Sequence, residues 1–126
     1  MILPKEEYYG NIEYKRYFNI SKNTNFFIQN LEYDLKNYNK TRLDKYTTQL
    51  NFRINEGEGS CIYVIGVNDS GSIYGLNDME IEFNIRVLNY MCLLLKCNIT
   101  LIIKCRFKEK KFIICKVKSR NYISII

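Results

Sequence analysis

The sequence predicts an α+β sandwich in which two main helices pack on a mixed sheet that ends in a basic β-hairpin. Two segments repeat apolar residues at the three- and four-residue spacing of a helix, and others alternate apolar and polar residues as strands do. The expected order is strand, helix, hairpin, helix, hairpin. The 126 residues fit one domain, with an expected N-terminal extension (1–9), a core (10–120) and a C-terminal tail (121–126).

The first strand and the first helix are expected in the N-terminal half. Residues Ile12–Phe18 alternate as a strand does, and an asparagine-rich connection follows at 19–25. Residues 26–38 are ambiguous in their pattern. The helix is expected over Arg42–Asn55. Its apolar face would consist of Leu43, Tyr46, Leu50 and Ile54.

Capping residues are predicted at both helices. Thr41, followed three residues later by Asp44, resembles a capping box at the start of the first helix. Gly57 stands where the end of that helix favours a left-handed residue. At the second helix, the side chain of Asn77 can accept a hydrogen bond from the backbone amide of Glu80. These residues therefore predict where each helix begins and where the first one ends.

A hairpin and the second helix are expected between the two ends of the core. Cys61–Val67 reads as a buried strand, residues 68–71 as a turn, and Ser72–Gly75 as the returning strand. The second helix would run from Asn77 to near Cys97. Its predicted core stripe is Ile81, Ile85, Leu88, Cys92 and Leu95.

Alternation continues over Ile99–Lys108 and again over Ile113–Val117, and the two segments predict a final hairpin. We expect a three-residue loop at Glu109–Lys111, which places Phe107 opposite Ile113 and Lys104 opposite Lys116. In this register one face of the hairpin is apolar and the other is cationic.

Positive charge is concentrated in the same segment. Residues 1–95 carry 10 lysines and arginines against 12 acidic residues, whereas residues 96–126 carry nine basic residues against Glu109 alone. Such asymmetry is typical of a surface that meets a polyanion, and we favour RNA over a lipid surface, with a solvated lysine-rich face as the alternative. The candidate RNA-binding residues are Lys104, Arg106, Lys108, Lys110, Lys111, Lys116, Lys118 and Arg120.

Several classes of function are excluded or disfavoured by composition. The chain has no histidine, which removes imidazole catalysis and histidine metal ligands. It has no G-x-x-x-x-G-K-[ST] motif, and Gly57–Gly59 is too short for a dinucleotide fingerprint. Five cysteines without a C-x-x-C pair predict buried free thiols. We expect no cofactor, no bound metal, no small-molecule substrate and no membrane segment, and a cytoplasmic location.

Four segments resemble the amino-terminal domain of the elongation-factor-like translational GTPases called GTP-binding proteins one and two. The similar runs are I-E-Y-K at Ile12–Lys15, T-T-Q-L-N-F-R-I-N-E-G-E-G at Thr47–Gly59, Y-V-I-G-V-N-D-S-G at Tyr63–Gly71, and Y-G-L at Tyr74–Leu76. They occur in the same order and with similar spacing over roughly Gly10–Leu101. The chain ends before a GTPase domain could start, so the resemblance implies a ribosome-associated accessory module without GTPase activity.

The biased composition and short length also make the chain similar to a microsporidian dormancy factor, a small protein that resembles this module and binds idle ribosomes. This resemblance implies a non-enzymatic monomer that contacts ribosomal RNA and ribosomal proteins. It would occupy a transfer-RNA site, for which we expect the exit site.

Two other functions remain open on the sequence. E-Y-K and I-G-V-x-D-x-G are more distantly similar to the Schlafen and Alba-type divergent domain, which implies a metal-dependent ribonuclease acting on transfer or ribosomal RNA. Glu13 and Asp69 fall on two of its three carboxylate positions, but the third falls near Tyr8. A third reading is an adaptor that binds proteins through the apolar tail Tyr122–Ile126.

Overall fold

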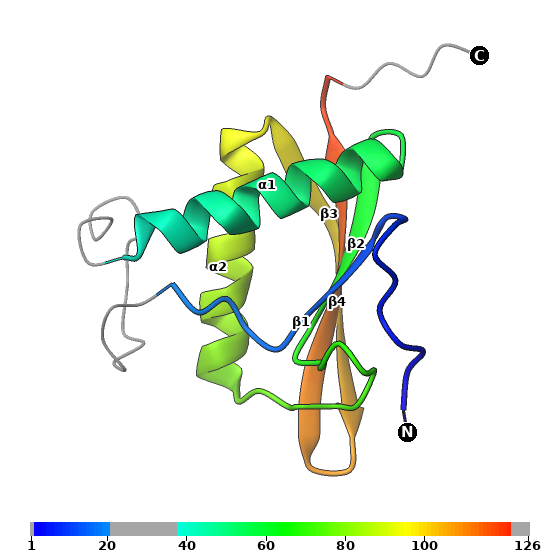
Figure 1. Cartoon of the computed structure of the whole chain (residues 1–126). Helices are drawn as coiled ribbons and strands as arrows, with labels where there is room; N and C mark the ends of the chain where they lie inside the picture. Colours follow the sequence, from blue (N-terminus) through cyan, green and yellow to red (C-terminus); the bar gives the residue numbers. More distant parts are fainter. Residues whose placement is uncertain (1, 21–37, 122–126) are drawn as a thin grey trace.

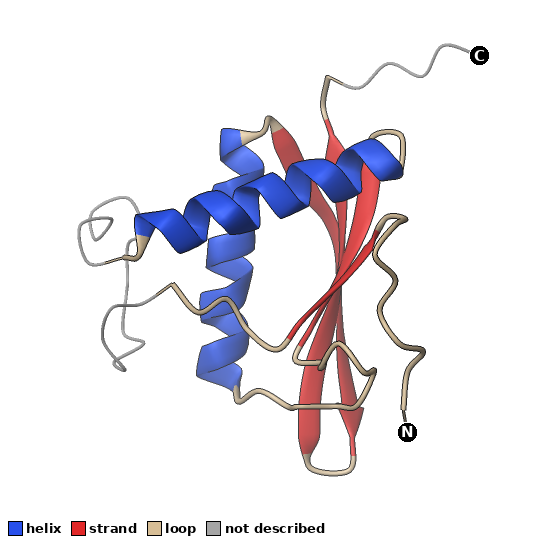
Figure 2. Ribbon diagram, viewed as in Figure 1, coloured by secondary structure: helices blue, strands red, loops and turns tan. Residues whose placement is uncertain are grey.

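The computed structural model describes residues 2–20 and 38–121 of the chain. Two helices, α1 (Lys40–Glu56) and α2 (Asp78–Leu94), lie on one side of a four-stranded sheet (Figures 1 and 2). The predicted α+β class with two main helices is therefore confirmed. The predicted connection at 19–25 falls mostly outside the described residues, and the predicted tail contact at 122–126 falls wholly outside them.

The sheet is mixed, as expected. Its strands are β1 (Ile12–Lys15), β2 (Ser60–Ile65), β3 (Cys97–Phe107) and β4 (Lys110–Ser119), in the spatial order β1-β2-β4-β3. Strand β1 runs parallel to β2, because α1 returns the chain between them, and the other two pairs are antiparallel. The last hairpin thus supplies one edge of the sheet and extends past the other strands at the lower end of Figure 1.

Helix α1 is longer at both ends than its apolar spacing predicted, and its caps differ. Asn39 is the N-cap, and its side chain accepts a hydrogen bond from the Arg42 amide at 3.1 Å. The predicted capping box is wrong, because Thr41 already lies inside the helix. Gly57 has φ −94°, so it is not left-handed; Glu58 and Gly59 are the residues with positive φ.

Helix α2 begins as predicted. The Asn77 side chain accepts from the Glu80 amide at 2.8 Å, and the Glu80 carboxylate accepts from the Asn77 amide at 3.0 Å. Of the predicted stripe, Ile81, Leu88 and Cys92 are buried, and the other two are partly buried. The helix buries a wider face than predicted, including Phe83, Val87 and Met91, because it contacts α1 as well as the sheet.

Both sides of the sheet carry a buried apolar cluster. On the helix side, alternate residues of β4 (Ile113, Cys115 and Val117) join the two helices in the main core. On the second side, Val64 and Phe112 pack with Ile73. The five cysteines are free thiols, as predicted, and all but Cys105 are buried. Burial raises the pKa of Cys61, Cys92 and Cys115 to about 12, which keeps these thiols protonated.

The segment after β2 is a loop rather than a second strand. Strand β2 ends at Ile65, and the first strand β1 ends at Lys15. The predicted return at Ser72–Gly75 makes two isolated bridges, Ile73 with Val67 and Ser72 with Ile2, but no strand. The loop instead continues to the last hairpin, where the Leu76 amide donates to the Lys111 carbonyl at 2.8 Å. None of the helices in residues 2–20 and 38–121 is long and apolar enough to cross a membrane.

Candidate nucleic-acid interface

The last hairpin closes through a tighter turn than predicted. Strands β3 and β4 are joined by Lys108 and Glu109 alone, so Phe107 pairs with Lys110 and Lys104 pairs with Ile113. Lys108 has φ 56°, the left-handed conformation that two-residue hairpin turns require. The predicted three-residue loop and its pairing of Lys104 with Lys116 are therefore wrong.

This register distributes the cations over both sides of the hairpin, so the predicted single cationic face is also wrong. The observed pairing differs from the expected one by an odd number of residues. Relative to β4, the side chains of β3 therefore lie on the side of the sheet opposite to the expected one. Near the turn, the helix side carries Lys104, Arg106 and Lys111, by their pairing partners. The second side carries Lys110, Lys116 and Lys118.

Five of the eight predicted cations nevertheless gather around the turn, in what we call the hairpin-tip cluster. Its members are Lys104, Arg106, Lys108, Lys110 and Lys111. All but Lys111 are exposed, and Glu109 is the one acidic residue in this stretch. Within the described part of the chain, Lys104 and Arg106 form no ion pair. The tip therefore presents excess positive charge at one end of the molecule.

The Asp78 carboxylate, beside the tip, forms an ion pair with one lysine of the hairpin-tip cluster. The Lys111 Nζ atom lies 2.9 Å from Asp78 Oδ1 at the start of α2. The hydrogen bond and charge of Lys111 lower the pKa of Asp78, and the charges of Lys104 and Arg106 lower it further. Cations from both strands of the tip thus lower the pKa of the same carboxyl group at the N-terminus of α2.

The remaining predicted cations, Lys116, Lys118 and Arg120, lie toward the opposite end of the sheet. Lys118 pairs with Ser60 at the start of β2, and the Arg120 amide donates to the Lys96 carbonyl at 3.0 Å. All three side chains are exposed. The predicted set therefore consists of a tip cluster and a distal group, which can be tested separately.

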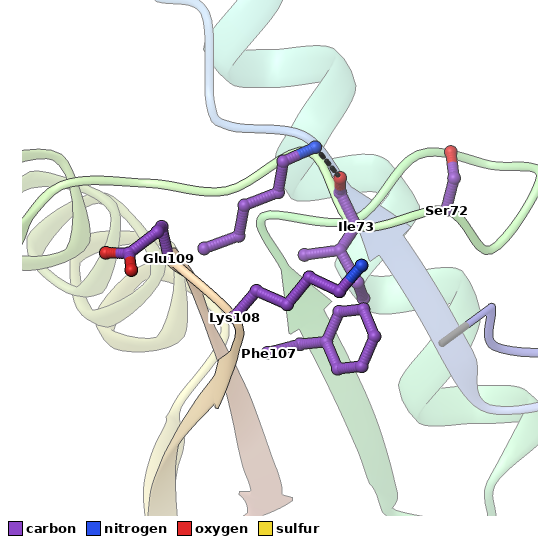
Figure 3. A pocket seen from close by; sticks show the side chains of 6 residues that line it. Ser72, Ile73, Phe107, Lys108 and Glu109 are labelled. Carbon is purple, nitrogen blue, oxygen red and sulfur yellow. Dashed lines mark hydrogen bonds between the residues drawn. The ribbon is translucent and has the colours of Figure 1, made fainter.

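A pocket of about 500 Å³ opens beside the hairpin turn, between the turn and the loop at residues 72–73 (Figure 3). Ile73 and Phe107 give it apolar walls. The Lys110 ammonium group donates to the Ile73 carbonyl at 3.2 Å, and the Lys108 Nζ atom lies 5.5 Å from the centre of the Phe107 ring. Sequence reasoning missed Phe107 as a site residue because the expected register assigned it to the packed face, opposite Ile113.

The two carboxylates predicted for a nuclease site differ in environment. Glu13 is buried on β1, and its oxygens lie 3.0 Å from Arg53 Nε and 3.2 Å from Lys15 Nζ. Asp69 is exposed in the turn after β2, and Tyr8 is 95% exposed. Because both oxygens of Glu13 are in ion pairs, this carboxylate is committed to the fold in the described structure.

Arg53 is the residue of this region that the sequence pattern did not reveal. It is 3% exposed on α1 and donates to the carbonyls of Glu7, Tyr9 and Gly10 at 2.8–3.0 Å, in addition to Glu13. One side chain therefore fastens the N-terminal segment to the first helix. Its spacing of three residues from Leu50 and seven from Tyr46, which places it on the predicted apolar face of the helix, was the available signal.

The attachment of the N-terminal segment is expected to depend on pH through Glu6. Burial, together with the nearby carboxyl groups of Glu13 and Asp69, raises the pKa of Glu6 to about 7. The hydrogen bond from the Tyr14 amide acts in the opposite direction and lowers this pKa. Since this pKa lies above the usual glutamate value of 4.5, the contribution of Glu6 to stability is fully present below pH 4.5 and is lost as the pH rises through about 7.

Urea denaturation of the wild type and of Glu6→Gln between about pH 5 and pH 8 measures this effect. We expect the variant, which keeps an oxygen for the Tyr14 amide, to gain stability relative to the wild type as the pH rises. A difference between the two proteins that stays constant over this range would contradict the raised pKa.

Part of the chain is similar to a known protein. The chain is 35% identical over 75 residues to GTP-binding protein 2 of mouse and of human. This stretch is 58% of the chain but 12% of either relative, so the chain spans about an eighth of their length. No protein-family model and no solved structure matches the chain. Part of this protein is therefore related to a region of GTP-binding protein 2, in agreement with the resemblance found in the sequence.

Proposed function

We propose that this protein is a non-enzymatic dormancy factor that binds idle ribosomes in the cytoplasm. It acts as a monomer, contacts ribosomal RNA and ribosomal proteins, and blocks a transfer-RNA site, the exit site. The observation that carries the proposal is the hairpin-tip cluster, in which five cations and one carboxylate occupy residues 104–111. The resemblance to translational GTPases and to a dormancy factor supplies the ribosome as the target.

The tip is suited to phosphate recognition rather than to reading a base sequence. Lysine and arginine side chains that replace the counterions of phosphates provide affinity that falls steeply with salt. The tip cluster offers these cations from both strands and from the turn, at the end of a hairpin that extends beyond the rest of the sheet (Figure 1). Such a projection can enter an RNA groove or a vacant transfer-RNA site, while the helices and the other strands serve as its scaffold.

Two matched triple charge reversals test the interface. One combines Lys104→Glu, Arg106→Glu and Lys108→Glu at the tip, and the other changes the distal residues Lys116, Lys118 and Arg120 to glutamate. Both change the net charge equally. We expect the tip variant to bind purified ribosomes at least about tenfold more weakly at about 150 mM salt, and the distal variant to lose less affinity.

Co-sedimentation with ribosomes across a salt series measures these affinities. Equal losses in the two variants would indicate that net charge, and not the tip, determines binding. Unchanged binding of the tip variant would contradict the proposed interface.

The dormancy role is tested by sucrose-gradient profiles of dormant and growing cells. We expect the protein to migrate with idle monosomes and to be depleted from polysomes. Its presence throughout polysomes would contradict a role restricted to idle ribosomes.

The ribonuclease alternative is separated by an activity assay. Incubation of the pure protein with transfer RNA and Mn²⁺ or Mg²⁺ is expected to leave the RNA intact, because the Glu13 oxygens are engaged by Arg53 and Lys15. Divalent-dependent cleavage that Glu13→Gln abolishes would overturn the non-enzymatic proposal.

A further inference from the structure

We propose that the pocket beside the hairpin turn holds one unstacked base of single-stranded RNA, with Phe107 as the stacking platform. This inference rests on the proposed function, since it states which form of RNA the tip takes. It assigns the tip a second kind of contact, because a base in the pocket adds an apolar interaction to the phosphate contacts of the cluster.

The walls of the pocket suit the flat face of a base. Ile73 from the loop and Phe107 from the end of β3 supply apolar surface, and the Ser72 side chain stands on the loop beside them (Figure 3). A volume of about 500 Å³ is in the range of small-ligand sites. Aromatic side chains are the usual platforms for bases in single-stranded nucleic acids, because every base has a face that can stack.

The charges around the pocket suit the phosphates on either side of that base. The Lys108 side chain lies along Phe107, and the Glu109 carboxylate points away from Ile73 (Figure 3). The Lys110 ammonium group uses one donor on the Ile73 carbonyl, which leaves two of its three for a phosphate. Positive groups thus border the apolar walls at the mouth of the pocket.

The position of β3 at the edge of the sheet predicts the path that the RNA backbone takes beyond the pocket. Phe107 and Lys110 lie on the second side of the hairpin, whereas Arg106 and Lys104 lie on the helix side. An RNA strand that leaves the pocket around this edge meets the second group of cations. The cations lie on both sides of the hairpin and do not form one flat face. This arrangement therefore fits a flexible single strand better than a rigid duplex.

Duplex RNA does not meet these requirements. Its bases are paired and stacked inside the helix, so none is free to enter a pocket, whereas loops and ends can present unstacked bases. The inference therefore predicts that the tip prefers unpaired RNA and that the preference depends on the base itself.

Binding of fluorescent oligoadenylate of roughly six nucleotides tests this prediction. Fluorescence anisotropy compares this probe with the same oligomer lacking its central bases and with a blunt duplex, at about 150 mM salt. We expect the wild type to bind the intact single strand about tenfold more tightly than the oligomer without bases. Equal binding of these two probes would overturn the proposal, and so would preferred binding of the duplex.

Three variants assign the base contact to Phe107. Phe107→Leu keeps an apolar side chain but removes the ring, and we expect it to bind both single-stranded probes equally weakly, about tenfold below the wild type with the intact probe. Phe107→Tyr keeps the ring and should bind like the wild type. The control is Phe52→Leu, because Phe52 is a 45% exposed phenylalanine on α1. If Phe107→Leu retains the preference for the intact oligomer, the pocket is not the base site.

Ribosome co-sedimentation of the same proteins distinguishes failure of this inference from failure of the proposed function. A wild type that binds ribosomes but does not discriminate between the probes would overturn the base site and leave the proposed function standing. A wild type that discriminates but does not bind ribosomes would support the base site and contradict the ribosomal target.

Discussion

Replacing Arg53 by methionine is expected to lower the free energy of unfolding by about 3–5 kcal/mol. Methionine can fill much of the same space, so the loss comes mainly from the groups that the guanidinium serves. Glu13 would remain buried with Lys15 as its remaining ion-pair partner among the described residues, and the carbonyls of Glu7, Tyr9 and Gly10 would lose their shared donor. Removing one partner of a buried ion pair leaves an uncompensated charge, which costs more than the pair itself contributes.

Urea denaturation of Arg53→Met, with Arg86→Met as the control, measures this effect. Arg86 also lies on a helix and pairs with Glu82 at 3.0 Å, but the two side chains are 41% and 68% exposed, against 4% and 8% for Arg53 and Glu13. The control should therefore cost less than about 1 kcal/mol. Adding Glu13→Gln to Arg53→Met should recover part of the loss, since it removes the unpaired charge. Similar costs for the two single variants would show that the buried ion pair is not the main contribution.

Gly57→Ala is expected to cost about 3 kcal/mol because the added methyl group has no space. A Cβ atom at this position would lie 1.8 Å from the Ser60 carbonyl oxygen and 2.7 Å from Asn11 Cβ. The first neighbour is backbone, so either the turn between α1 and β2 or the start of β2 must shift. The φ value of −94° suits any residue, so the expected loss is steric and not conformational.

Gly10→Ala is the matched control for this prediction. Gly10 has φ +88°, which strains an alanine, but among the described residues no atom apart from those of its chain neighbours lies within 4 Å of an added Cβ. We expect a loss of about 1–2 kcal/mol from backbone strain alone. Thermal and urea unfolding of both variants separate the two effects, and a smaller cost for Gly57→Ala than for Gly10→Ala would contradict the steric role.

Much of the fold could be predicted because it depends on neighbours along the chain. The Asn77–Glu80 capping box and the buried Ile81, Leu88 and Cys92 follow from spacings of three and four residues. The caps of α1 were less predictable. Asn39, Thr41 and Asp44 all offer plausible capping side chains, and the contacts of Gly57 come from residues that the helix pattern does not include.

The candidate site was predicted in its residues but not in its geometry. Leu101, Ile102 and Ile103 are three consecutive apolar residues on the edge strand, and each is at least 40% exposed. Because both faces of that stretch are apolar, alternation could not distinguish a two-residue turn from a three-residue loop. A bulge between Ile99 and Leu101 then changes the register again within β3.

The sequence alone determined the fold class, the second helix with its cap, the free thiols and the excess of cations in the last quarter of the chain, because composition and short-range spacing encode these properties. Only the tertiary structure decided where those cations lie. Strand β4 packs Ile113, Cys115 and Val117 against the helices and pairs with β2, which sets the side of the sheet that each lysine occupies. The role of Arg53 likewise arises from carbonyls more than 40 residues away in the chain, a separation that no local pattern can report.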